Sequence, residues 1–308
     1  MNQSTHNPLA CPVCRAPLQN DERSYYCPEG HSFDIARQGY LNLLLSHQKR
    51  SKHPGDSKEM VTARQAFLSE GHYFPIYAAL EKLVLKHLRK DPLDHPLNIA
   101  DLGCGEGYYT QLLDKKLRET MSSQASGQKP EQASAVQTWG LDISKDAIIS
   151  ACKHNSNVRW LIGNLTQTPF AEHSMDIATV LFCRVSPNEL VRLLKPGGIF
   201  IFVKPDDGHL IQLREQIYSD VKGQKKNPSI EQAINTDEHP VQHPGLTLID
   251  TQALTQSITL NKSESIQTLF KMTPHYWRTK PEQREKIKQL DQLNTDISVN
   301  LFCYQRSL

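Results

Sequence analysis

The sequence has no apolar stretch long enough to cross a membrane and no start of the kind that directs secretion. Its longest apolar runs, such as IATVLFC and GIFIFV, fall well short of the about 20 residues that a transmembrane helix needs. The first residues, MNQSTHNPLA, lack the charged and then apolar pattern of a signal peptide. We therefore expect a cytoplasmic protein that does not contact a membrane.

The sequence also has little net charge. Its 35 basic and 33 acidic residues leave a formal charge of +2. A nucleic-acid partner would have to be met by a local group of cations, because the field of the whole molecule is weak. The length of 308 residues, 38% of them hydrophobic, is enough for one large core and a smaller satellite domain.

Seven cysteines are present, an odd number, and three of them lie within the first 27 residues. In a cytosolic chain such clustering favours a metal over disulfides. Cys11, Cys14, Cys27 and His31 follow the spacing Cys-x2-Cys-x12-Cys-x3-His, and a proline follows the first and third cysteines, as suits the tight turns of a zinc ribbon. Buried thiols beside a surface histidine are the alternative. Because four protein ligands leave no position for water, we expect a structural zinc and not a catalytic one.

A basic segment follows this module. The stretch KRSKHPGDS has turn chemistry and no apolar period, so it predicts an exposed loop. A solvated lysine-rich surface is the simplest interpretation of its cations. Two helices are expected next, over 58–70 and 75–90, because Gly71 ends the first and a proline starts the second.

From Leu97 the sequence alternates between strands and helices. Strands are expected at LNIADLG, TWGLDIS, VRWLIGN, MDIATVLFC and GIFIFVK, separated by helices over 108–121, 144–153, 187–194 and 209–221. This alternation predicts an α/β fold with a doubly wound, Rossmann-like sheet. GLTLIDTQALTQSITLN and DISVNLFCYQR would complete the sheet with a late strand pair.

Polar stretches over about 121–137 and 222–245 predict flexible insertions. We divide the chain into a zinc-ribbon-like domain over 1–45, a basic loop with linking helices over 46–95, and the α/β domain over 96–308.

The stretch DLGCGEG carries the clearest sign of a ligand. A strand ends at Asp101, and Gly103, Gly105 and Gly107 follow in a turn before the next helix. A turn without side chains lets a ligand approach the backbone and places it near the helix N-terminus. Asp142 ends the next strand, where a carboxylate can accept both hydroxyls of a ribose. NAD is the alternative cofactor, although its fingerprint is Gly-x-Gly-x-x-Gly.

Four signals, DLGCGEG, GLDIS, LIGNLTQTPF and LLKPGG, occur in the order of the class I S-adenosylmethionine-dependent methyltransferases, which the chain resembles. The resemblance implies that the glycine turn carries the methionine part of the cofactor. The acid after the second strand would bind the ribose, and the residues after the third strand would flank the adenine. The matching residues are Asp101, Gly103, Gly105, Asp142, Asn164 and Leu165.

The longer stretches CPEGHSFDIARQGYLNLL, KRSKHPGDSKEM, ARQAFLSEGHYFPI and MTPHYWR resemble, nearly end to end, the bacterial large-subunit rRNA guanine-N1 methyltransferases. This resemblance implies methylation of N1 of a guanine in a 23S rRNA hairpin loop, with a zinc module that recognises the RNA. A homodimer is a possible assembly. After the fourth strand the family tends to have aromatic-Ala-Pro, where this chain has FCRVSP.

The resemblance extends the expected contacts. Besides the residues already matched, those expected at S-adenosylmethionine are Tyr73, Glu106, Gly107, Tyr108, Tyr109 and His209. The placement of positive charge in and beside the zinc module, and not the resemblance, predicts RNA contacts at Arg37, Lys49, Arg50 and Lys52.

Three alternatives remain open from the residues alone. A small-molecule class I methyltransferase would have the same core but would not explain the zinc module. A Cys183 thiolate attacking C6 of a pyrimidine would support C5 methylation, although no proline precedes Cys183 and no second motif cysteine is evident. A zinc-ribbon binding protein with an inactive methyltransferase fold is disfavoured by the intact glycines and acids. The sequence indicates no catalytic base for removal of the proton from guanine N1.

Overall fold

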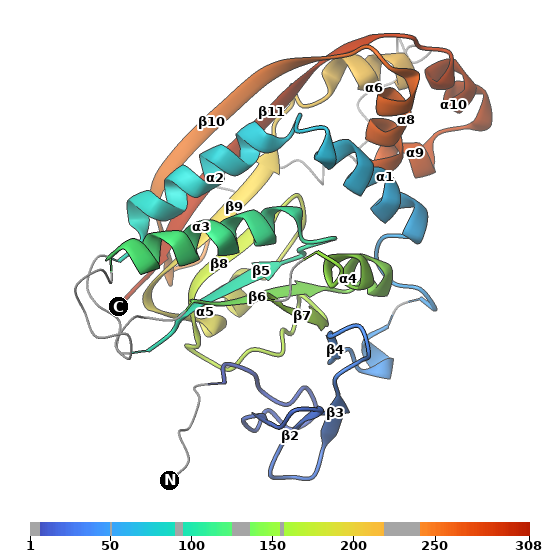
Figure 1. The fold of residues 1–308 in the computed structure, drawn as a ribbon. Helices are drawn as coiled ribbons and strands as arrows, with labels where there is room; N and C mark the ends of the chain where they lie inside the picture. Colours follow the sequence, from blue (N-terminus) through green and yellow to red (C-terminus); the bar gives the residue numbers. More distant parts are fainter. Residues whose placement is uncertain (1–6, 50, 90–94, 125–135, 155–156, 219–240) are drawn as a thin grey trace.

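The computed structural model describes residues 7–49, 51–89, 95–124, 136–154, 157–218 and 241–308. Its centre is an eight-stranded sheet (Figure 1). The strands of this sheet are β4 (Leu41–Asn42), β5 (Leu97–Leu102), β6 (Val136–Asp142), β7 (Arg159–Ile162), β8 (Met175–Leu181), β9 (Leu194–Pro205), β10 (Leu246–Leu260) and β11 (Leu293–Arg306).

The order across the sheet is β10-β11-β9-β8-β5-β6-β7-β4. From β4 to β9 each neighbouring pair is parallel, whereas β11 runs antiparallel to both β9 and β10. The order reverses between β5 and β8, and in such sheets ligands bind beyond the carboxyl ends of the strands at this point. The predicted doubly wound sheet and its late strand pair are confirmed.

Short local signals set the helix starts. Ser57 and Ser144 cap their helices by accepting the main-chain N–H of Met60 and Ala147, and Pro75 and Pro187 each lie in a first turn. The helices are α1 (Lys58–Ser69), α2 (Phe74–His87), α3 (Tyr108–Gln124), α4 (Lys145–Ala151), α5 (Pro187–Leu193), α6 (Ile211–Tyr218), α8 (Ser263–Met272), α9 (Pro274–Arg278) and α10 (Pro281–Lys288).

Some predicted boundaries were wrong. Helix α2 ends at His87 and not near residue 90, because the backbone of Leu88 is extended. The insertion expected over 121–137 is too long at both ends, since α3 continues to Gln124 and β6 begins at Val136. Its middle, 125–135, lies outside the described residues, as do 222–240 of the second expected insertion.

The two faces of the sheet bury different clusters. Ile99 and Ala100 are neighbours in β5, yet they point to opposite faces, as the alternation of a strand requires. Ile99 packs in the cluster that α2, α3, α6 and α8 cover, and α2 and α3 lie in front of the sheet in Figure 1. Ala100 packs in the cluster under α5. The sheet is therefore covered on both sides, as in a doubly wound fold.

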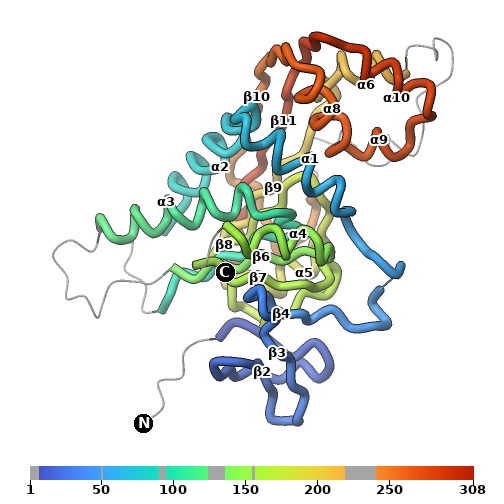
Figure 2. The backbone as a smooth tube through the Cα atoms, turned by 45° about the vertical axis from the view of Figure 1, so that its right-hand side comes forward, coloured from blue at the N-terminus to red at the C-terminus, as the bar shows by residue number. Residues whose placement is uncertain are grey.

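The cysteine-rich N-terminus is joined to this sheet through a common core. Its own sheet is antiparallel and consists of β1 (Gln19–Asn20), β2 (Ser24–Tyr26) and β3 (Ser32–Asp34). Leu9, Leu18 and Leu43 are buried in the same cluster as Leu161 of β7. Strand β4 extends the main sheet beside β7, and the Leu43 N–H donates to the Ile162 carbonyl at 2.8 Å. Figure 2 shows this module, in dark blue, directly below the sheet.

The boundary expected at residue 45 thus falls just after a strand of the main sheet, a pairing that the sequence did not indicate. The three-part division stays a prediction. Among the described residues, no helix combines the length and the apolar character that a membrane span requires.

Two of the glycines make room for one side chain, the buried indole of Trp160. A Cβ atom at Gly107 would lie 2.3 Å from this ring, and one at Gly140 would lie 2.4 Å from it. The backbone of Gly107 also has a positive φ of 82°, which favours glycine. Close packing against Trp160 therefore requires both glycines, independently of any ligand.

We predict that Gly107→Ala destabilises the protein by about 1–3 kcal/mol more than Gly71→Ala does. Gly71 has nearly the same φ, 81°, but a Cβ there meets nothing within 4 Å. Both variants place an alanine in the left-handed region, which destabilises them to a similar extent. The difference between their free energies of unfolding therefore isolates the contact with Trp160. Urea unfolding of the two variants measures it, and equal midpoints would show that Trp160 moves aside freely.

Candidate functional site

The four predicted zinc ligands meet at one point of the N-terminal module. Their ligand atoms all lie within 4.8 Å of one another. Cys14 Sγ is 3.6 Å from Cys27 Sγ, which in turn is 3.3 Å from Nδ1 of His31. Two sulfurs bound to one tetrahedral zinc are about 3.8 Å apart, since each Zn–S bond is about 2.3 Å. The donor set and its spacing fit a zinc ion with no position left for water.

Two tight turns present these ligands. The Arg15 N–H donates to the Cys11 carbonyl at 2.9 Å, and the Gly30 N–H donates to the Cys27 carbonyl at 3.0 Å. Cys11 and Cys27 are themselves buried in the cluster shared with the main sheet. Two of the four metal ligands therefore belong to the hydrophobic core that joins the module to the sheet.

The second site lies at the carboxyl ends of β5 and β6, where the glycine turn rests on its neighbouring strand. The Gly103 N–H donates to the Leu141 carbonyl at 2.7 Å, and the Gly105 N–H donates to Oδ2 of Asp142 at 2.9 Å. All three glycines of the turn have positive φ. Of the three, Gly105 has the most room, because a Cβ there would approach only a guanidinium nitrogen of Arg64, at 3.3 Å.

Asp142 holds this edge together. Its Oδ1 accepts the Ser144 N–H at 2.7 Å while Oδ2 holds Gly105. Burial raises the pKa of its carboxyl group. Each carboxylate oxygen can accept about two hydrogen bonds, so one acceptor position per oxygen is left for a ligand. Such a pair of acceptors suits two neighbouring hydroxyls.

Asp101 lies behind the turn and not on its surface. It is only 3% exposed, and its oxygens accept the hydroxyls of Thr110, at 2.5 Å, and Thr179, at 2.9 Å. Burial raises its pKa to about 6. Asp101 thus connects the start of α3 to β8, and it supports the turn where direct contact with a ligand was expected.

Arg64 is a site residue that the sequence interpretation missed. From α1 its guanidinium pairs with Asp56 and, at 3.4 Å, with Oε2 of the buried Glu106 in the glycine turn. The stretch ARQAFLSEGHYFPI contains Arg64, but an arginine on a helix is more often a surface residue. Only the fold brings α1 against a turn that is 42 residues away in the sequence.

The predicted ring residues form two contacting pairs, Tyr73 with His209 and Tyr108 with Tyr109. Tyr73 is buried, and its hydroxyl lies 3.2 Å from Nε2 of His209. Nδ1 of His209 accepts the Ser298 N–H at 3.2 Å, so the ring proton sits on Nε2 and is donated to Tyr73. Burial lowers the pKa of His209 to about 4. Within the described part of the chain, the buried Tyr109 hydroxyl has no hydrogen-bond partner.

The other residues expected at the cofactor or the RNA have fewer contacts that relate them to the glycine turn. Leu165 lies against the turn, with Cδ1 3.5 Å from a Cβ built at Gly103. The side chain of Asn164 accepts both the N–H and the hydroxyl of Thr166 at 2.9 Å. The predicted RNA contacts Arg37, Lys49 and Lys52 are exposed, whereas Arg50 lies outside the described residues.

Cys183 is not suited to nucleophilic attack. Its thiol donates to the Leu102 carbonyl at 3.2 Å, and its sulfur fills the space beside Gly103, where a Cβ would come within 2.4 Å. Burial raises the pKa of this thiol well above its usual value. The thiolate that C5 methylation of a pyrimidine requires is therefore disfavoured.

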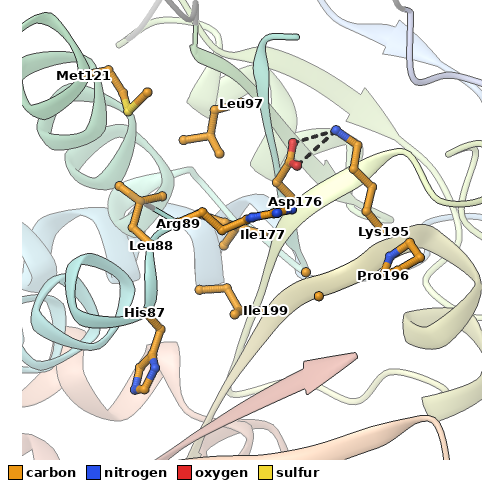
Figure 3. A pocket seen from close by; sticks show the side chains of 12 residues that line it. His87, Leu88, Arg89, Leu97, Met121, Asp176, Ile177, Lys195, Pro196 and Ile199 are labelled. Carbon is orange, nitrogen blue, oxygen red and sulfur yellow. Dashed lines mark hydrogen bonds and ion pairs between the residues drawn. The ribbon is translucent and has the colours of Figure 1, made fainter. Parts of the chain in front are cut away.

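A separate pocket lies at the opposite, amino-terminal edge of the strands (Figure 3). It is lined by the start of β5, β8 and β9 and by the end of α2, and an ion pair between Asp176 and Lys195, at 2.9 Å, forms part of its wall. Since ligands of parallel sheets bind at the carboxyl edge, we regard this pocket as unrelated to the glycine turn.

We predict that the double substitution Cys11→Ala/Cys27→Ala abolishes zinc binding and lowers the thermal stability of the whole protein. The cause is that both cysteines belong to the core shared by the module and the sheet. Metal analysis of purified protein should find one zinc per chain, and Cys152→Ser, outside the cluster, should keep it. Retention of zinc by the double variant would contradict the assignment.

Comparison with known proteins agrees with both sites. Residues 9–52 match the family model described as RlmA, N-terminal, a zinc ribbon, and residues 93–261, more than half of the chain, match that of a methyltransferase domain. The methyltransferase domain takes S-adenosylmethionine as its cofactor, and the cluster of three cysteines and His31 holds a structural zinc.

Three curated proteins are similar over most of the chain. The 23S rRNA (guanine(748)-N(1))-methyltransferase of Streptomyces fradiae is 33% identical over 67% of this chain and 66% of its own length. A putative 23S rRNA (guanine-N(1)-)-methyltransferase of Micromonospora griseorubida is 33% identical over 68% of this chain and 69% of its own. YxjB of Bacillus subtilis (strain 168), with the same putative name, is 27% identical over 94% of both. The chain therefore belongs to the family of 23S rRNA (guanine-N1)-methyltransferases, with an RlmA-type zinc ribbon ahead of a class I methyltransferase domain.

Proposed function

We propose that this protein transfers a methyl group from S-adenosylmethionine to N1 of a guanine in a hairpin loop of 23S rRNA, in the cytoplasm. The main observation behind the proposal is that the protein combines two features. A zinc ribbon with four ligands shares its hydrophobic core with the sheet, and this sheet carries a glycine turn bonded to Asp142. Relatives with this name are similar over up to 94% of the chain. A small-molecule methyltransferase would need only the second part.

The residues around the glycine turn fit the cofactor. Asp142 keeps two acceptor positions for the ribose hydroxyls, and the backbone at Gly105 is open to a ligand. The Arg64 guanidinium is already paired with Asp56 and Glu106 but has further N–H groups beside the turn, and the Tyr109 hydroxyl is a buried donor with no partner among the described residues. Together they suit the carboxylate of the methionine part. S-adenosylmethionine supplies a methyl group on a sulfonium, which is already activated for in-line displacement.

The protein then has mainly to position the reactants. Guanine N1 carries a proton that must leave, but the titratable groups near the turn are committed elsewhere. Asp101 is buried behind the turn, where its oxygens accept the Thr110 and Thr179 hydroxyls, and the unprotonated nitrogen of His209 accepts the Ser298 N–H. The pKa of His209, about 4 because of burial, makes it a weak base as well. We assign no catalytic residue and attribute the rate to orientation of the base.

The loop that follows the zinc ribbon ends beside the glycine turn. The Ser144 hydroxyl donates to the Asp56 carbonyl at 2.7 Å, and the carboxylate of Asp56 pairs with Arg64. Asp56 is the fourth residue after Lys52, so their Cα atoms are at most about 14 Å apart. Exposed Lys49 and Lys52 therefore lie between the ribbon and the turn. We propose that Lys49 and Lys52, with Arg37 and Arg50, hold RNA phosphates there, which makes binding salt-dependent.

We predict that Asp142→Ala weakens S-adenosylmethionine binding by about tenfold to a hundredfold. This is the loss of charge-assisted hydrogen bonds worth about 1.5–3 kcal/mol. Calorimetric titration measures it, with Asp146→Ala as the control, because Asp146 is a nearby exposed acid in the first turn of α4. Thermal unfolding of each variant separates loss of the contact from loss of the turn. An affinity like that of the control would reject the assignment of Asp142.

The proposed reaction is tested with purified protein, labelled S-adenosylmethionine and 23S rRNA that lacks the modification. After digestion to nucleosides, the label should be found in 1-methylguanosine. Label in a C5-methylated pyrimidine would instead support the role for Cys183 considered above. Transfer to small molecules but not to RNA would overturn the proposal.

A further inference from the structure

Phe182 is an exposed aromatic residue at the edge of the cofactor site, and the function argued so far does not use it. It directly follows β8, and 41% of its surface is exposed. Its backbone has a φ of 58°, in the left-handed region that a bulky residue rarely adopts. Both the exposure and the backbone conformation cost free energy, so the position has to be held by its surroundings.

The surroundings fix Phe182 from three sides. Its N–H donates to the Val203 carbonyl at 3.0 Å, which ties it to β9. The next residue, Cys183, is bound to the Leu102 carbonyl and packs beside Gly103. The rings of Tyr73 and His209 support the side chain, with ring centroids 6.3 Å and 5.9 Å from that of Phe182. The ring is therefore held next to the glycine turn while much of its surface stays open.

The order of the strands separates Phe182 from the expected seat of the cofactor nucleoside. Asp142 ends β6, and Asn164 and Leu165 follow β7, both on one side of β5. Strand β8, which Phe182 follows, lies on the other side of β5. The glycine turn that follows β5, where the methionine part is expected, lies between them. An aromatic ring on the β8 side thus faces the place where an acceptor would approach.

We propose that Phe182 is the platform on which the target guanine stacks when it is turned out of the RNA, so that its N1 edge meets the methyl donor. This inference rests on the proposed function. N1 lies on the Watson–Crick edge and is reached only in a splayed base, and splayed bases are commonly held by stacking on aromatic side chains. A flat exposed ring held rigidly by two other rings suits this task, because it needs no further ordering when the base arrives.

The test compares Phe182→Ala with Phe182→Tyr and Phe182→Trp, which keep an aromatic ring. With an unmodified 23S rRNA hairpin transcript, Phe182→Ala should lower kcat/KM by about 5- to 150-fold, the loss expected for one base–aromatic stack. The two aromatic variants should restore most of this loss. Affinity for S-adenosylmethionine, measured by calorimetry, should stay within about twofold of the unchanged protein.

Phe74→Ala is the matched control, because Phe74 is another exposed phenylalanine, 49% accessible, at the start of α2. It should leave kcat/KM unchanged. If Phe182→Ala equals the unchanged protein in kcat/KM, or if its main effect is loss of cofactor affinity, the stacking role is overturned while N1 methylation stands. If the unchanged protein does not form 1-methylguanosine in the transcript, the proposed function and this inference are overturned together.

Discussion

The hydrogen bond from the Gly105 main chain to Asp142 is the interaction on which the cofactor site depends. It joins the turn, in which every second residue is a glycine without a side chain, to the end of the adjacent strand β6. The turn is supported from below by Asp101, which is bound to Thr110 and Thr179, and from the side by Arg64 through Glu106. Three carboxylates, the buried Asp101 and Glu106 and the half-buried Asp142, therefore serve first to shape the backbone. Acceptor positions on Asp142 that the backbone does not use are available to the ligand.

The same edge of the sheet connects the cofactor site to the zinc ribbon. Leu43 bonds to the end of β7, and Asp56, 13 residues further along the chain, contacts both Ser144 and Arg64. The ribbon, the basic loop and the glycine turn are thus fixed along one path on the molecule. If the loop holds RNA phosphates as proposed, the RNA lies close to the glycine turn, and local cations suffice to bring it to the cofactor of a nearly neutral protein.

Much of this was predictable from the sequence, and the rest required the fold. The doubly wound sheet follows from the alternation of strands and helices, and the zinc ligands follow from the spacing of the cysteines and His31. The sequence could not show that Gly107 is needed because of Trp160. A glycine in the sequence does not reveal whether it makes room for a ligand or for a side chain of the protein. Nor could Arg64 or the pairing of β4, since both depend on contacts between segments that are distant in the sequence. Asp101 was placed correctly at the turn, but its burial was not foreseen.

The most direct test is a crystal structure of the protein with S-adenosylhomocysteine and a 23S rRNA hairpin. The ribose should lie on Asp142, and a guanine should stack on the β8 side of the glycine turn with N1 directed at the cofactor sulfur. A base bound over β6 and β7, or a guanine whose N1 points away from the sulfur, would contradict methylation at N1 by this site.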